Sequence, residues 1–362
     1  MLYYYALYFY IILLIMFYES VNYKILKKIF FLLILGGLII LPAIRDSSVG
    51  TDTKMYVNFT TWDYSFTDWL KTIEVGNALI FSFYNYFTPM ENKYVFLTYS
   101  ILTNFFIFYA VFKYSKNVFV SVVVLFGFNC FYFYQMNVMR QCLAVGITFL
   151  ANSLLLSNKK KLSLLFYFLA IMFHYSAVVC LFLIFIKKYV NRFFLLILIF
   201  LSLAFVIISL ATKYLFSFVS GLGFLVEKYG AYATAYNDNG AGIKIFMLNL
   251  SIFLIFILFS NVKKCLEDDS FKIYFIFMIL GLVIQFCIAF LNLSAMSFGR
   301  IFQYFIYGYI FGIPMMINSI SKEFRPIIYI FLFIIFALYM YAFIVIAQVH
   351  ELIPYQDSKD WS

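Results

Sequence analysis

The sequence predicts an all-α, polytopic integral membrane protein with about 10–12 transmembrane helices. Of its 362 residues, 65% are hydrophobic and only 12% are charged, and the mean hydropathy is +0.97. Average globular domains carry about 25% charged residues. The apolar residues form runs that approach or exceed the ~20 residues that a helix needs to cross a bilayer core. These observations exclude a soluble domain and a disordered chain, and we expect one polytopic domain over residues 1–362.

The apolar runs define ten candidate spans and two long connections. The candidate spans are residues 2–18, 29–44, 94–112, 118–135, 138–156, 193–212, 245–261, 271–291, 301–318 and 327–347. The long connections are residues 45–93 and 213–244, which mix acidic and basic side chains.

Basic residues indicate how the spans are oriented, because short cytoplasmic loops carry an excess of Lys and Arg. The net charge of +10 comes mainly from short clusters between apolar runs, so it does not indicate a nucleic-acid-binding face. The clusters are Lys24, Lys27 and Lys28; Lys113 and Lys116; Lys159–Lys161; Lys187, Lys188 and Arg192; Lys263 and Lys264; and Lys322 and Arg325. All of these clusters lie on the cytoplasmic side of the membrane if both termini and both long connections are external.

The segment 162–186 is a special case, because basic clusters lie on both sides of its apolar run. If both clusters are cytoplasmic, the segment forms a hairpin of two short half-helices with His174 near its tip. Such a turn at membrane depth needs protein or a water-filled cavity around it. The alternative is a single span, and we favour the hairpin because it keeps the later loops on their preferred sides.

A small set of polar residues falls on the predicted external side. Its members are Arg45, Asp52, Glu74, Arg140, Gln141, His174 and Arg300. Helix capping, arginine snorkelling and a hydrogen-bonded core histidine explain each of them singly. Together they suit chemistry on a lipid-linked diphosphate, since arginines bind diphosphates through forked hydrogen bonds and a histidine or carboxylate can accept a proton.

Roles follow from this chemistry. We expect Arg140 and Arg300, with Arg45 as a third candidate, to clamp a leaving diphosphate. His174 is the first choice for the base, and Glu74 or Asp52 is the second. Gln141 is expected to orient Arg140 or a sugar hydroxyl, and Tyr229 in the second long connection to pack on a sugar. We expect no cofactor and no obligatory metal. The five cysteines show no metal-type spacing.

Several short motifs resemble those of the EpsG family. Residues 45–56 resemble its R…GxDTxxY motif, and Glu74-Val75-Gly76 is similar to its ExG element. Residues 137–177 resemble its N…RQ…A…KK…FHxSA block, and Pro354-Tyr355 resembles a common family ending. The resemblance covers most of the chain, and the spacing from RQ to FH is its most specific part. The aromatic residue often found after ExG is Asn77 here.

The resemblance implies a Wzy-type polysaccharide polymerase related to GT-C membrane glycosyltransferases. Such an enzyme joins undecaprenyl-diphosphate-linked oligosaccharide repeat units into O-antigen, capsule or exopolysaccharide at the outer face of the bacterial cytoplasmic membrane. It also implies a chain-length regulator protein as a partner. The alternatives are a flippase of the same lipid-linked oligosaccharide, a polysaccharide ligase and a membrane scaffold. A flippase would place its charges along a central path.

Overall fold

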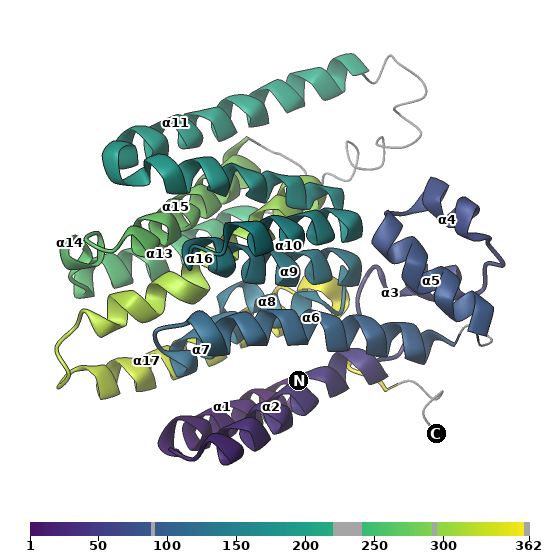
Figure 1. Cartoon of the computed structure of the whole chain (residues 1–362), viewed down its shortest axis with the longest axis horizontal. Coiled ribbons are helices and arrows are strands. Elements are labelled where there is room, and N and C mark those ends of the chain that lie inside the picture. The colour runs from purple at the N-terminus through teal and green to yellow at the C-terminus, as the bar shows by residue number, and fades with distance from the viewer. Residues whose placement is uncertain (88–90, 220–240, 292–294, 358–362) are drawn as a thin grey trace. The chain divides into compact units, whose positions relative to one another are not determined.

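The computed structural model describes residues 1–87, 91–219, 241–291 and 295–357, and these residues are predominantly helical (Figure 1). Within these ranges there is no β-strand, and the only pairing of that kind is an isolated bridge between Arg45 and Asp357. The predicted all-α fold is therefore confirmed. The chain forms two compact units, residues 1–181 with 326–362, and residues 182–325.

The first unit contains the N-terminal helices and the C-terminal end of the chain. Its elements are α1 (Leu2–Ser20), α2 (Lys24–Ile44), α3 (Thr53–Thr60), α4 (Phe66–Thr72), α5 (Val75–Phe87), α6 (Asn92–Tyr114), α7 (Val118–Gly127), η1 (Phe128–Cys130), α8 (Phe131–Tyr134), α9 (Met139–Leu156), α10 (Lys160–Phe173), η2 (Tyr175–Leu181), α17 (Arg325–Tyr341), η3 (Ala342–Ile346) and η4 (Val349–Glu351). Helix α9 is the most buried of the long helices and packs against α6 and α10. It therefore forms the core on which the first unit is built.

The second unit is built around one apolar helix. Its elements are α11 (Phe182–Val219), α13 (Ala241–Phe259), α14 (Val262–Cys265), α15 (Asp269–Phe290) and α16 (Ala295–Asn318). Helix α15 packs against α11, α13 and α16. Gly308 lets α16 approach α15 closely, since a Cβ there would lie 2.5 Å from the Tyr274 carbonyl oxygen.

Eight helices of the described residues are long and apolar enough to cross a membrane. They account for eight of the ten predicted spans, and α16 covers the predicted span 301–318. Many apolar side chains on these helices are exposed, above all on α11, as expected for helices in contact with lipid. The chain is therefore a multi-pass membrane protein.

The region predicted as one span over 118–135 is not a continuous helix. Helix α7 ends at Gly127, and Asn129 and Cys130 have positive φ angles of 51° and 48° before α8 begins. The Tyr339 hydroxyl donates to Asn129 Oδ1 at 2.5 Å, so α17 holds the break in place. This contact is remote in sequence, which explains why the apolar pattern alone predicted an unbroken helix.

The segment 162–186 breaks where the sequence predicted. Helix α10 ends at Phe173, His174 has extended backbone angles (φ −158°, ψ 120°), and η2 packs back against α9 and α10. The returning limb differs from the predicted short half-helix, because it is a 3₁₀-helix that leads into the 38-residue α11. Helix α11 has non-helical backbone angles at Phe193, and Figure 1 shows that this helix is sharply bent.

The basic clusters of α2 and α6 and the candidate residues Arg45 and Arg140 lie at opposite ends of the first unit. The Tyr18 ring lies 4.7 Å from the Phe112 ring, and Lys27 Nζ lies 5.2 Å from the Tyr18 ring centroid, so the end of α1, the start of α2 and the end of α6 meet. Lys28 and Lys113 line a cavity at this same end. Arg45 and Arg140, in contrast, lie at the end of α2 and the start of α9.

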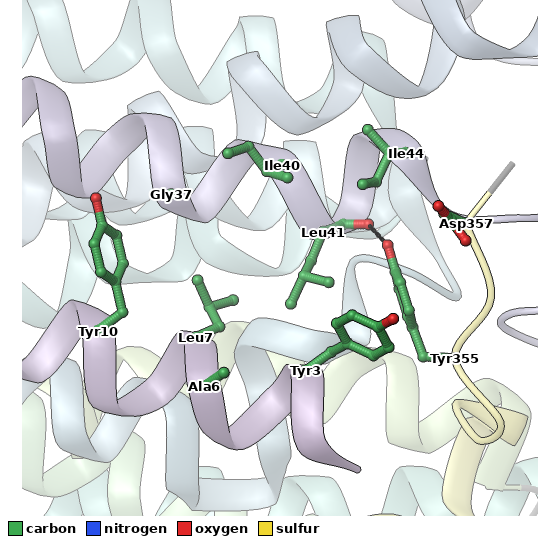
Figure 2. A pocket seen from close by; sticks show the side chains of 10 residues that line it. All are labelled: Tyr3, Ala6, Leu7, Tyr10, Gly37, Ile40, Leu41, Ile44, Tyr355 and Asp357. Atoms are coloured by element: carbon green, nitrogen blue, oxygen red, sulfur yellow. Dashed lines mark hydrogen bonds between the residues drawn. The ribbon is translucent and has the colours of Figure 1, made fainter. Parts of the chain in front are cut away.

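The C-terminal segment closes over the other end of α1 and α2. The Tyr355 hydroxyl donates to the Leu41 carbonyl oxygen at 3.0 Å, and the Tyr4 hydroxyl donates to the Leu352 carbonyl oxygen. A mostly apolar cavity of about 480 Å³ lies between α1, α2 and this segment (Figure 2). Its polar end is formed by Tyr3, Tyr355 and Asp357.

Gly50 forms the sharp turn between α2 and α3. Its φ is +94°, and a Cβ there would lie 2.4 Å from the Met136 carbonyl oxygen. The next residues dock on the same segment, since Thr51 Oγ1 donates to Asn137 Oδ1 at 2.5 Å and Thr53 Oγ1 donates to the Met136 carbonyl oxygen at 3.0 Å. The turn therefore fixes where α9 starts.

We expect Gly50→Ala to lower the free energy of unfolding by about 1–3 kcal/mol, because it adds backbone strain and a steric clash. Gly36→Ala is the matched control, since Gly36 lies inside α2 and a Cβ there meets nothing within 4 Å. That change should be neutral or slightly stabilising. Thermal unfolding of the detergent-solubilised protein measures both, and equal unfolding temperatures for the two variants would contradict the prediction.

Candidate active site

The centre of the candidate site is an ion pair between α9 and the start of α5. Arg140 Nη1 lies 2.8 Å from Glu74 Oε2, and the two side chains are only 18% and 10% exposed. A charged pair this far from water needs further hydrogen bonds to offset its loss of hydration. The sequence predicted that these two residues lie on the same membrane face, and the structure places them in direct contact.

Asn77 supplies part of that support. Its Nδ2 donates to Glu74 Oε2 at 2.9 Å and to the Phe173 carbonyl oxygen at 2.7 Å, while the Tyr99 hydroxyl donates to Asn77 Oδ1 at 2.6 Å. Gly76 permits this close approach, since a Cβ there would lie 3.0 Å from the Met172 carbonyl oxygen. Asn77 therefore connects the ion pair to the end of α10.

His174 follows directly after the carbonyl group that Asn77 binds. The side chain is half-buried, and its Nδ1 lies 2.7 Å from Ser176 Oγ. A base role at Nε2 requires that Nδ1–H donates to Ser176, since the other ring nitrogen then keeps its lone pair. The Ser176 backbone N–H also donates to Nδ1 at 3.4 Å, and this contact is satisfied by the reverse tautomer, in which Nε2–H is a hydrogen-bond donor.

Aromatic rings surround the Arg140 guanidinium. Its central carbon lies 5.9 Å from the Tyr56 ring centroid and 6.0 Å from that of Phe59. Arg140 Nε is buried and has no hydrogen-bond partner among the described residues. A buried guanidinium N–H without a partner is a costly arrangement that a bound anion would relieve.

Arg45 is buried in a different environment. Its guanidinium lies 4.2 Å from the Phe96 ring centroid, and its polar contacts are the Pro42 carbonyl oxygen, Thr53 Oγ1 and Met139 Sδ. Arg45 is 2% exposed. Burial lowers the pKa of Arg45 to about 10. Thr53 lies at the turn after α2, and Met139 lies at the start of α9. Because Arg45 contacts both, it stabilises the backbone that positions Arg140.

The other predicted residues occupy varied positions. Asp52 occupies the N-cap position of α3 without a capping hydrogen bond from its side chain, and its backbone N–H donates to Asn137 Oδ1 at 2.8 Å. Gln141 is buried on α9 next to Arg140, and Arg300 lies half-buried in α16 of the second unit. Tyr229 lies outside the described residues. Among the residues that are described, no group of three His, Cys, Asp or Glu side chains could hold a metal ion.

The contacts also identify residues that the sequence reasoning did not select. The Tyr56 ring lies next to the Arg140 guanidinium, the Tyr99 hydroxyl donates to Asn77, and Asn77 joins three elements of the site. Spacing could have indicated Asn77, since it lies one helical turn after Glu74. No local signal could have indicated Tyr99, because its partner lies on another helix.

These features define a multi-pass helical membrane protein with a buried, aromatic-lined arginine–carboxylate pair in its first unit, at the end remote from Lys27, Lys28 and Lys113. The chain belongs to the EpsG family, whose sequence pattern it matches over residues 28–357. EpsG is a family of Wzy-type, polysaccharide-polymerase-like proteins. No curated protein and no solved structure was found to match the chain.

Proposed function

We propose that this protein polymerises undecaprenyl-diphosphate-linked oligosaccharide repeat units into a surface polysaccharide. Membership of the EpsG family supports this activity. The observation that supports the position of the active site is the buried Arg140–Glu74 ion pair. The Nε–H group of Arg140 has no hydrogen-bond partner among the described residues. The lysines at the opposite end of the first unit support an active site at the outer face of the bacterial cytoplasmic membrane, by the positive-inside rule.

In the proposed reaction, a hydroxyl oxygen of one repeat unit attacks the anomeric carbon of the growing glycan. The bond between that carbon and the diphosphate oxygen breaks, and the lipid diphosphate leaves with the bonding electrons. Arg140 stabilises the negative charge that develops on the diphosphate. Arg300 is proposed as a second diphosphate ligand, with Arg45 acting through the position of α9. No cofactor or metal takes part in this scheme.

The proton of the attacking hydroxyl passes to a base. We propose His174 in this role, with its Nδ1–H bonded to Ser176 Oγ, and Glu74 or Asp52 as the second choice. Glu74 Oε2 is already engaged by Arg140 and Asn77, which leaves it less available to an attacking hydroxyl than His174. Gln141 is proposed to orient Arg140 or a sugar hydroxyl, and Tyr229 to pack on a sugar. A chain-length regulator protein is proposed as a partner.

Deletion of the gene, followed by analysis of the surface glycan, tests this proposal. A polymerase defect should leave single repeat units on the surface lipid, and plasmid-borne wild-type protein should restore the polymer. Arg300→Ala should restore less polymer, and of shorter chains, than Arg300→Lys. Lipid-linked units trapped inside the cell would instead indicate a flippase, and a polymer that stays on its lipid carrier would indicate a ligase.

A further inference from the structure

Five aromatic rings form one cluster in the connection between α2 and α6. The 59–81 aromatic cluster consists of Phe59, Trp62, Tyr64, Trp69 and Phe81. The rings of Trp62 and Trp69 stack with centroids 5.9 Å apart and an interplanar angle of 23°, and Phe81 stacks on Trp69 at 4.9 Å. Tyr64 lies 5.0 Å from Trp62 and 5.1 Å from Trp69.

The backbone around this cluster is held by specific hydrogen bonds. Ser65 and Asp68 form a capping box at the start of α4. Asn85 Nδ2 donates to the carbonyl oxygens of Trp62 and Tyr64 at 3.4 and 3.3 Å, which fastens the connecting turn to α5. The two rings on this turn are therefore presented by a fixed backbone.

Burial divides the cluster into a base and an outer surface. Trp69 and Phe81 are fully buried, whereas Trp62 is half-buried and Tyr64 is 36% exposed. Trp69 Nε1 has no hydrogen-bond partner among the described residues, although buried indole N–H groups usually find one. Trp62 and Tyr64 therefore form an aromatic outer surface that rests on the buried rings of Trp69 and Phe81. The exposed Asp63 lies between Trp62 and Tyr64 in the sequence.

The cluster is continuous with the candidate active site. Phe59 lies 4.9 Å from Trp62 on one side, and its ring centroid lies 6.0 Å from the guanidinium carbon of Arg140 on the other. An anion bound at Arg140 would therefore have its attached group next to the aromatic face.

We propose that Trp62 and Tyr64 form a subsite for a sugar ring of the glycan whose diphosphate Arg140 binds. The subsite rests on the proposed function and identifies the part of the substrate that contacts this surface. A sugar presents an apolar face of C–H groups, which packs on aromatic rings, and hydroxyl groups at its edge, which donate to a carboxylate. We propose that Asp63, which is exposed and lies between the two residues in sequence, supplies such a carboxylate.

Binding measurements on the intact protein in lipid nanodiscs test the subsite. The probes are inorganic diphosphate and the free oligosaccharide released by mild acid from the lipid-linked pool of cells that lack the gene. We expect Trp62→Ala to weaken oligosaccharide binding about ten-fold and to leave diphosphate binding unchanged. Trp62→Phe should retain most of the affinity, and Tyr64→Ala should show a smaller loss. Tyr86→Ala is the control, because Tyr86 is 83% exposed on α5.

Unchanged oligosaccharide affinity in both Trp62→Ala and Tyr64→Ala would overturn the subsite. Unchanged affinity together with weaker retention in the membrane would show that the two rings anchor the protein at the bilayer surface instead. The proposed function has its own test, since a deletion strain with wild-type polymer would contradict that function whatever the titration shows.

Discussion

Arg140→Ala is expected to abolish polymer formation and to lower the free energy of unfolding by about 3–5 kcal/mol. Removing one member of a buried ion pair leaves the other as an uncompensated buried charge, and this is a large penalty. Here the remaining charge is Glu74, whose side chain is 10% exposed and which keeps the hydrogen bond from Asn77. Glycan analysis in the deletion strain and thermal unfolding measure the two effects.

Three variants separate the catalytic loss from the structural one. Arg140→Lys keeps the charge and should recover much of the stability, but it loses the forked geometry that suits a diphosphate. In Glu74→Gln with Arg140→Ala, no buried carboxylate is left, so the double variant should be more stable than Arg140→Ala alone. Lys71→Ala is the matched control, because Lys71 forms an exposed ion pair with Asp68. Wild-type polymer length and amount in Arg140→Ala would rule out the diphosphate role.

His174→Ala is expected to reduce the polymerisation rate by about 10²–10⁴-fold, which is the usual contribution of a general base. The stability should change little, since the side chain is half-buried and does not belong to the buried core. The measurement is the initial rate of chain growth from isolated lipid-linked repeat units in membranes that contain equal amounts of each variant.

His174→Gln decides between the two tautomers. The glutamine side chain places an amide near the position of Nε2, so it can donate a hydrogen bond there but cannot accept the proton. If His174 is the base, this variant should be as inactive as His174→Ala, and Ser176→Ala should show a smaller loss through misorientation of the ring. Substantial activity in His174→Gln would instead assign His174 as a donor to the diphosphate, and full activity in His174→Ala would make it structural.

The helical class could be predicted because long apolar runs leave a chain few alternatives in a bilayer, where every backbone polar group needs an internal partner. The helix break at His174 was also predictable, since basic clusters on both sides of a short apolar segment favour a turn over a single span. The break at Asn129 was not, because it is held by Tyr339, 210 residues further along the chain. Local patterns carry no information about such a contact.

The candidate site also combines residues that the sequence could indicate with contacts that it could not. Composition and spacing identified Glu74, Arg140 and His174 as polar residues that stand out in an apolar chain. They did not show that Asn77 joins Glu74 to the end of α10, or that Arg45 is enclosed by Pro42, Thr53, Met139 and Phe96. Those arrangements depend on how α2, α5, α9 and α10 pack.

The sequence by itself determined the membrane class, the family and the separation of lysines from the other polar residues, because these depend on composition and order along the chain. Only the tertiary structure decided which of the charged residues are partners and which arginine has an unsatisfied N–H. The physical reason is that a charge is stabilised by groups within a few ångströms, and most of those groups lie on other helices.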